Sequence, residues 1–142
     1  DAPHETSPVV PPVDDTEVVK TATYAGLKVA CEREVLNGET PWAIVRPTVV
    51  VGPHDPSDRL GFWVRRRRRG NPYPVPARLD QPVQVVHAGD VAIAIRAAIE
   101  VGGTYNLASD PFPFSALVGP AGVPVGDWEG EARPFVDWPL VM

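Results

Sequence analysis

The sequence predicts an α/β fold with a parallel sheet. A long helical segment at residues 15–36 is followed directly by a short apolar run at residues 42–45. A helix that feeds such a buried strand is half of a βαβ unit, the connection that parallel strands require. Eighteen prolines confine regular structure to residues 13–40, 57–71 and 83–110. We therefore expect helices and strands to alternate within these three stretches.

The composition is that of a soluble globular protein. The 142 residues are 44% hydrophobic and 22% charged, and no apolar run approaches the roughly 18 residues that a membrane span needs. The net charge of −5 argues against a general nucleic-acid binder. With one cysteine, Cys31, and scattered histidines at His4, His54 and His87, we expect no disulfide, no metal site and a reducing, cytoplasmic location.

The first residues differ from an export signal. The chain begins at Asp1 without a methionine, and its first fifteen residues are acidic and rich in proline. We expect that sequence upstream of Asp1 is missing. Residues 1–13, called the lead-in below, are predicted to be extended and to lie outside the core.

The first helix is predicted over residues 15–36. Asp14 with Glu17 resembles a capping box, and Asn37-Gly38 supplies a C-terminal stop. Its predicted apolar stripe consists of Val18, Ala22, Ala25, Val29 and Leu36.

Tyr24 and Lys28 lie four residues apart in this helix. This spacing places both side chains on one side of the helix, one turn apart, at the edge of the predicted stripe, so their polar ends can converge on one ligand. An ammonium favours the phenolate form of a neighbouring tyrosine, which suits proton transfer. On spacing alone, however, such a pair is more often an ordinary surface pair.

The strand predicted at residues 42–45 is bounded by Pro41 and Pro47 and suits a buried parallel strand. Residues 49–51 continue in extended form until Gly52-Pro53 breaks them. In open α/β sheets, ligands bind beyond the carboxyl ends of the strands. Residues 47–54 are therefore the predicted ligand-binding loop.

A second helix is predicted over residues 58–69, capped by Ser57 and closed by Gly70-Asn71. It contains five consecutive arginines, residues 65–69, which suggest nucleic-acid or phosphate binding. The alternative is a solvated arginine-rich face whose stems pack along neighbouring structure. We favour this alternative and expect no salt-dependent binding to DNA or RNA.

Two short strands are predicted at residues 74–78 and 83–87, joined by a turn around Asp80. Asp90 is predicted to cap a helix over residues 91–101. This helix is expected to place Ile95, Ala98 and Ile99 on one face. A further strand is predicted at residues 104–107, and no element is assigned to residues 110–142, which hold Trp128, Phe135 and Trp138.

Four motifs in order resemble one enzyme family. They are Tyr24-x-x-x-Lys28-x-x-x-Glu32, Arg46-Pro47-x-x-Val50-Val51-Gly52-Pro53, Asp90-Val91-Ala92 and Tyr105-Asn106-Leu107. Together they resemble the extended short-chain dehydrogenase/reductases, also called the NAD-dependent epimerase/dehydratase family. The resemblance implies a partial Rossmann-like fold, a catalytic helix plus the following parallel strand, in residues 1–53, and a small mixed α/β substrate-binding region in residues 54–142.

The resemblance also implies roles for particular residues. Tyr24 would be the catalytic acid or base, and Lys28 would hold the nicotinamide ribose of NAD or NADP. Pro47 and Val50 would lie beside the nicotinamide ring. The substrate contacts it implies are Val49, Val83 and Val85.

The chain departs from the family pattern in its cofactor-binding half. It contains no Gly-x-x-Gly-x-x-Gly turn after a strand to hold the pyrophosphate. The family's catalytic serine or threonine is also missing, because Thr6 and Ser7 lie in the polar lead-in. We expect this chain alone to be incomplete and inactive, with a matching first half or a second copy as its partner. The alternative is a non-enzymatic interaction module that retains part of the fold.

The substrate expectation rests on Val83. Family members that act on nucleotide sugars resemble one another in an arginine seven residues before the aspartate that matches Asp90, and Val83 stands there. Valine cannot pair with a diphosphate. Unless Arg59, Arg78 or Arg96 replaces that arginine, we expect a small carbonyl or hydroxyl compound without charge as substrate.

Overall fold

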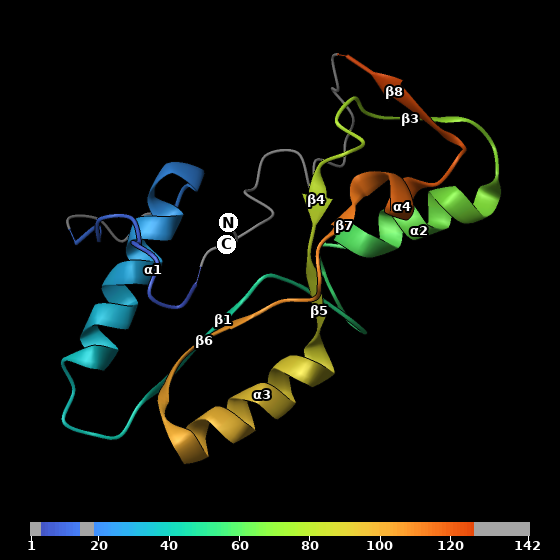
Figure 1. The fold of residues 1–142 in the computed structure, drawn as a ribbon. Helices are drawn as coiled ribbons and strands as arrows, with labels where there is room; N and C mark the ends of the chain where they lie inside the picture. The colour runs from blue at the N-terminus through green and yellow to red at the C-terminus, as the bar shows by residue number, and fades with distance from the viewer. Residues whose placement is uncertain (1–3, 15–18, 127–142) are drawn as a thin grey trace.

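The computed structural model describes residues 4–14 and 19–126 (Figure 1). In chain order its elements are α1 (Thr21–Leu36), β1 (Ala43–Pro47), β2 (Val49–Val51), α2 (Arg59–Arg69), β3 (Tyr73–Pro76), β4 (Pro82–Val83), β5 (Val85–His87), α3 (Ala88–Val101), β6 (Gly103–Leu107), β7 (Phe112–Pro113), α4 (Phe114–Val118) and β8 (Gly122–Val125). In Figure 1, α1 lies on one side of the molecule, and α2 and α4 lie on the other.

The strands form pairs, most of them parallel. β1 pairs with β6, β2 with β5 and β3 with β8, all parallel, whereas the two-residue strands β4 and β7 pair antiparallel. The helix α3 connects β5 to β6 and packs against β1, β5 and β6. This arrangement confirms the α/β class and is consistent with a partial Rossmann-like fold. The strands on either side of Asp80 do not pair with each other, because β3, β4 and β5 each have another partner.

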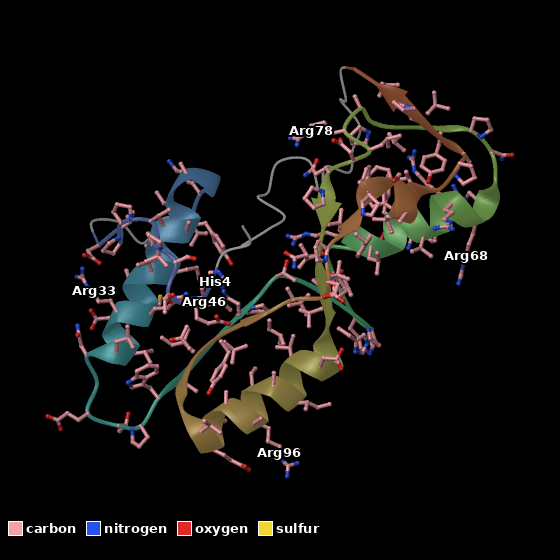
Figure 2. All side chains as sticks on the ribbon, viewed as in Figure 1. His4, Arg33, Arg46, Arg68, Arg78 and Arg96 are labelled. Atoms are coloured by element: carbon pink, nitrogen blue, oxygen red, sulfur yellow. The ribbon has the colours of Figure 1, made fainter. Side chains whose placement is uncertain are left out.

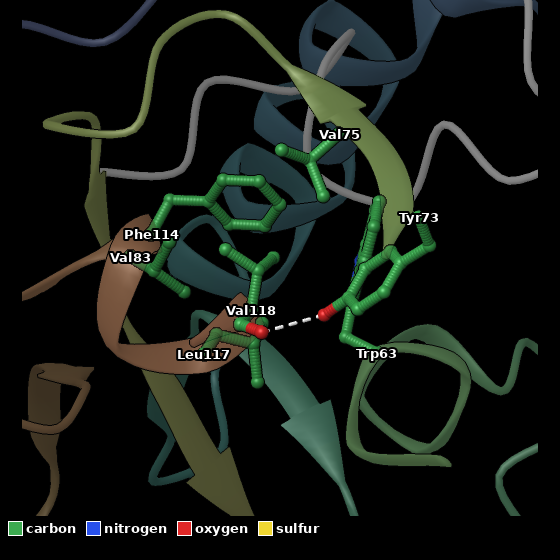
Figure 3. Close-up of a cluster of buried hydrophobic side chains, with 7 residues drawn as sticks. All are labelled: Trp63, Tyr73, Val75, Val83, Phe114, Leu117 and Val118. Atoms are coloured by element: carbon green, nitrogen blue, oxygen red, sulfur yellow. Dashed lines mark hydrogen bonds between the residues drawn. The ribbon is translucent and has the colours of Figure 1, made fainter. Parts of the chain in front are cut away.

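The main hydrophobic core lies between α2, α4 and the strands β3 and β4 (Figure 3). Its members are Trp63, Tyr73, Val75, Val83, Phe114, Leu117 and Val118. The rings of Trp63 and Phe114 meet edge to face at 5.1 Å between centroids, a favourable aromatic geometry. The buried hydroxyl of Tyr73 donates a hydrogen bond of 2.6 Å to the carbonyl of Val118. Burial raises the pKa of Tyr73, so this hydroxyl stays a donor.

The start of α1 was predicted wrongly. The helix begins at Thr21, and Val19 and Lys20 precede it in non-helical conformation. The hydroxyl of Thr23 accepts a hydrogen bond of 3.0 Å from the backbone N–H of Lys20, which caps this end. Residues 15–18, and with them part of the predicted capping box, lie outside the described residues. The predicted end at Leu36 is confirmed.

The predicted apolar stripe of α1 is wrong as well, because Ala22, Ala25 and Leu36 are exposed. Among the residues of this helix whose burial is described, Gly26 is the buried one. The backbone N–H of Val13 donates to the carbonyl of Gly26 at 3.1 Å. A Cβ atom on Gly26 would lie only 2.4 Å from Cγ2 of Val13. The described part of the lead-in, residues 4–13, is not extended throughout as predicted, because it turns at residues 5–7, and its Val13 packs closely against the helix.

The helix α2 ends as predicted, at Gly70 with a left-handed φ of 70°. Its start differs from the prediction, because the N-cap is Asp58. The hydroxyl of Ser57, the predicted cap, donates instead to Oδ1 of Asp55 at 2.5 Å. Asp58 turns its carboxylate toward Arg65, two turns along the helix, and this contact spans the first two turns.

The helix α3 is confirmed and begins at Ala88, three residues before its predicted start. The cap is His87 instead of Asp90, because Nδ1 of His87 accepts a hydrogen bond of 3.1 Å from the backbone N–H of Gly89. Ala98 is buried as expected, but Ile99 is 72% exposed. The predicted apolar face is therefore only partly buried in the described structure.

The segment after Ser109 carries structure that the sequence pattern did not predict. The elements β7, α4 and β8 lie there, and α4 contributes Phe114, Leu117 and Val118 to the core. The aromatic residues of the last sixteen positions, Trp128, Phe135 and Trp138, lie outside the described residues. None of the helices described is both long enough and apolar enough to cross a membrane.

Candidate functional site

Tyr24 and Lys28 are both exposed on α1, and 43% of Tyr24 is accessible. Glu32 follows one turn later on the same face, since residues four apart in a helix are surface neighbours. A hydroxyl, an ammonium and a carboxylate therefore follow one another along this side of the helix.

The Glu32 end of this face is tied to the sheet (Figure 2). Nε of Arg46 donates to Oε1 of Glu32 at 2.9 Å, and Nη2 donates to Oε2 at 2.6 Å. Both side chains are mostly buried, with 19% and 20% exposure. The hydrogen bonds that Arg46 donates to the Glu32 carboxylate raise the pKa of Arg46, although burial opposes this. Because Arg46 precedes Pro47 at the end of β1, the ion pair directs this face of α1 to the carboxyl end of that strand.

The sequence motifs contained Glu32 and Arg46, but sequence reasoning gave them no role. The sequence signal that could have indicated a role for Glu32 was the spacing Lys28-x-x-x-Glu32. This spacing places Glu32 one turn beyond Lys28 on the side of the helix that also carries Tyr24. A bidentate pair of this kind is among the stronger protein ion pairs, since two parallel hydrogen bonds fix its geometry.

The lead-in forms further hydrogen bonds beside Arg46. The carbonyl of Glu5 accepts a hydrogen bond of 3.4 Å from Nη1 of Arg46. Its carboxylate accepts one of 3.0 Å from the backbone N–H of Asn106, the residue paired with Arg46 across β1 and β6. The bond from Asn106 is the main reason why the pKa of Glu5 is lowered. The lead-in therefore bridges both strands beside α1.

The carboxyl ends of β1 and β2 provide the predicted loop residues. Thr48 lies between the two strands, and its backbone N–H donates to the carbonyl of Leu107 at 3.0 Å while its hydroxyl donates to that of Gln84 at 3.3 Å. Pro47, directly before Thr48, is partly buried, and Val50, two residues after Thr48, is exposed. Both are open to a ligand at this edge, which is where parallel sheets bind ligands.

The three valines predicted to contact substrate differ in burial. Val83 has no exposed surface and belongs to the core cluster, so a ligand reaches it only if its neighbours move. Val49 and Val85 are partly buried against the same cluster and face each other across β2 and β5. Their role as substrate contacts stays a prediction.

The residues present fit one end of a nicotinamide dinucleotide. Tyr24 and Lys28 are exposed residues one turn apart, and a hydroxyl and an ammonium are both groups that can donate hydrogen bonds to a ribose. At the pyrophosphate end the fit fails, because the sequence has no Gly-x-x-Gly-x-x-Gly. Each helix that the structure describes begins without such a turn. We therefore expect this chain alone to have no useful affinity for NADH or NADPH.

The arginine run of α2 serves mainly the fold. Arg65 pairs with Asp58, whose pKa falls because Arg65 donates to it. The guanidinium of Arg66 lies 4.4 Å from the ring centroid of Phe62, within cation–π range. Nη1 of Arg67 donates to the carbonyl of Ala116 at 2.5 Å. Three of the five arginines thus hold neighbouring structure, as expected for a solvated face.

Two of the arginines considered as substitutes for a diphosphate clamp lie apart from α1. Figure 2 shows Arg78 beyond β4, and Arg96 extending from the outer side of α3. Among the described residues, no group of three or more histidine, cysteine, aspartate or glutamate side chains is arranged to hold a metal ion.

Comparison with known proteins identifies the family. The NAD dependent epimerase/dehydratase family model matches residues 2–108, which include α1, the ion pair at Arg46 and the strands β1 to β6. A comparison with curated proteins found no match to this chain. Since the match covers about three quarters of the sequence, the chain belongs to the NAD dependent epimerase/dehydratase family.

Proposed function

We propose that this chain supplies the proton-transfer and substrate-binding portion of an NAD(P)-dependent oxidoreductase, epimerase or dehydratase that acts on a small carbonyl or hydroxyl compound. The observation that carries the proposal is the face Tyr24-Lys28-Glu32, in which Tyr24 and Lys28 are exposed and the mostly buried Glu32 pairs with Arg46 at the carboxyl end of β1. The family match supports nicotinamide-dependent chemistry at this face.

Tyr24 has the role of proton donor or acceptor at its phenolic oxygen. A carbonyl that is reduced needs a proton at its oxygen, and an alcohol that is oxidised must lose one there. Lys28 positions the ribose by donating hydrogen bonds from its ammonium group. Glu32 and Arg46 are positioning residues that hold α1 beside the end of β1. They take no part in proton transfer, because their charges are already paired with each other. When bound, the nicotinamide takes up or gives the hydride.

The substrate proposed is small and uncharged. The side chains assigned to substrate contact are Val49, Val83 and Val85, and valine gives a phosphate no hydrogen bond. Each charge-assisted bond to a diphosphate that is lost costs about 1.5–3 kcal/mol. A nucleotide sugar would therefore bind poorly beside these residues.

The roles of the pair are tested by two substitutions in the full-length protein. Tyr24→Phe is expected to remove most turnover and leave cofactor affinity nearly unchanged, because only the proton-transfer group is lost. Lys28→Met is expected to impair both turnover and cofactor affinity. Steady-state kinetics and titration of nicotinamide fluorescence measure the two effects. If neither substitution changes turnover, the pair is structural and the interaction-module alternative is favoured.

The substrate class is tested by screening the full-length protein with neutral carbonyl compounds and with nucleotide sugars. Turnover or thermal stabilisation is expected with the first class. Micromolar binding of a UDP- or dTDP-sugar, without any response to neutral compounds, would refute the substrate assignment but leave the roles of Tyr24 and Lys28 intact.

A further inference from the structure

A groove of about 490 Å³ lies between α2 and the segment formed by β7 and α4. Its volume falls within the range of about 300–1,000 Å³ that small-molecule sites occupy. The lining residues are Val64, Arg67, Arg68, Phe112, Ala116 and Leu117. Figure 1 shows α2 and α4 on the side of the molecule opposite α1, so this groove is separate from the face that carries Tyr24.

The lining combines apolar side chains with positive charge. Val64, Phe112 and Leu117 provide apolar surface, and they continue the core cluster toward the solvent. Arg67 and Arg68 provide two guanidinium groups, and none of the lining residues is acidic. A ligand that matches this lining has an apolar body and an anionic head, because a guanidinium binds a carboxylate or phosphate oxygen with paired N–H donors.

Arg67 is held in place before any ligand arrives. Its Nη1 donates to the carbonyl of Ala116 at 2.5 Å. Its stem lies against the backbone of Gly119, where an added Cβ would be 3.1 Å from Nε. The remaining N–H groups of this fixed guanidinium can face a ligand without a large loss of side-chain entropy.

Arg68, by contrast, is exposed, and Figure 2 shows it extending from α2 into open space. Its neighbours Arg65 and Arg66 are engaged by Asp58 and by the ring of Phe62. The chain as a whole carries a charge of −5, so positive charge gathered on this helix is a local feature. Arg68 is thus an exposed guanidinium at the rim of the groove that can pair with an anion beside Arg67.

We propose that this groove binds a small amphipathic carboxylate, with its head between Arg67 and Arg68 and its apolar body on Phe112 and Leu117. The site is independent of the reaction at Tyr24. Octanoate is the probe, and 1-octanol, which has the same chain without the charge, is the matched neutral ligand.

The experiment compares three forms of the protein by calorimetric titration and by chemical-shift mapping. The wild type is expected to bind octanoate about 3- to 10-fold more tightly than octanol, the range for a solvent-accessible charge pair with good geometry. Arg68→Gln is expected to lower octanoate affinity toward the octanol level, with the remainder of the difference due to Arg67, and to leave octanol affinity unchanged. Arg69→Gln is the control, since it removes the same charge from the next residue, which does not line the groove, and it should change affinity less than about twofold.

A second variant tests the apolar part. Ala116→Leu leaves the carbonyl that binds Arg67 in place and fills the groove with a larger side chain, so it should weaken both ligands. Shifts of the Leu117 methyl and Phe112 ring signals on octanoate addition would support the site. Equal affinity for octanoate and octanol, or equal effects of Arg68→Gln and Arg69→Gln, would overturn the proposal. So would self-association that Arg68→Gln abolishes in the absence of octanoate binding, because a second copy would then be the occupant.

Discussion

The region around α1 and the region around α2 and α4 are held together by different forces. The first depends on the bidentate pair of Arg46 with Glu32 and on the close contact of the lead-in with Gly26. The second is built around Trp63, which has no exposed surface and packs among aromatic and aliphatic side chains. The polar region carries the chemistry proposed for this family member. The apolar region holds seven of the eleven buried hydrophobic residues in the described part of the chain.

This difference explains where the functional side chains lie. A residue that transfers protons must reach its substrate, and the exposure of Tyr24 is consistent with the role proposed for it. The helix that bears it is therefore held by a few polar contacts on its other residues. Regions with few buried apolar contacts open more easily than a packed core. We expect the two regions to respond differently to substitution.

The largest effect on stability is expected from the apolar region. Trp63→Ala should lower the free energy of unfolding by about 3–5 kcal/mol, because it removes a large side chain and leaves a cavity. Denaturant titration measures the loss. A loss below about 1 kcal/mol would contradict the view that this cluster is the main source of stability.

A smaller effect is expected where the lead-in meets α1. Gly26→Ala introduces a Cβ atom 2.4 Å from Cγ2 of Val13 and 3.0 Å from the carbonyl of Pro11. The overlap should cost about 1–3 kcal/mol, which exceeds the gain of about 1 kcal/mol from better helix propensity. Adding Val13→Ala removes the nearer clash and should restore part of the loss. If Gly26→Ala alone is stabilising, the lead-in does not pack on this face.

The ion pairs of the polar region can be compared directly. Glu32→Gln should lower the free energy of unfolding by about 1–2 kcal/mol, because it leaves the mostly buried Arg46 without its charge partner. Arg33→Gln is the matched control, since its pair with Asp14 is 50% and 56% exposed and should contribute less than about 1 kcal/mol. Equal effects would mean that the Arg46 pair does not anchor α1.

The smallest effect concerns pH at the start of α2. Arg65 lowers the pKa of Asp58 in the folded state, so the stabilisation is present above the unfolded value of about 3.9 and is lost as pH falls through the lower folded value. Hydrogen exchange at residues 59–65 should therefore accelerate in acid. Asp58→Asn should remove this acceleration of exchange in acid. If the wild type and Asp58→Asn respond identically to acid, the pair of Asp58 with Arg65 is not the cause.

Much of the fold was predictable from local signals. Proline spacing and apolar runs gave β1, β2 and the closing of α2 at Gly70. The helix starts were harder, because Asp90 and Ser57 have good capping side chains but His87 and Asp58 occupy those positions. Such competition between neighbouring polar residues is decided by tertiary contacts that the sequence pattern does not contain.

The missed parts have a common physical cause. The core helix α4 spans only Phe114–Val118, too short for a helical period to be recognised, and prolines surround it. Burial of Gly26 depends on the lead-in, which lies ten or more residues away in the chain. The candidate site was predicted through Tyr24 and Lys28, but the role of Arg46 needed the three-dimensional contact with Glu32.

The central claim is that α1 carries chemistry and contributes little to stability through Tyr24. The most direct measurement takes turnover and the free energy of unfolding together for Tyr24→Phe in the full-length protein. Turnover is expected to fall by about 10²-fold or more, the usual contribution of a positioned acid or base, while the free energy of unfolding changes by less than about 0.5 kcal/mol. Unchanged turnover, or a loss of activity that follows entirely from unfolding, would contradict the account.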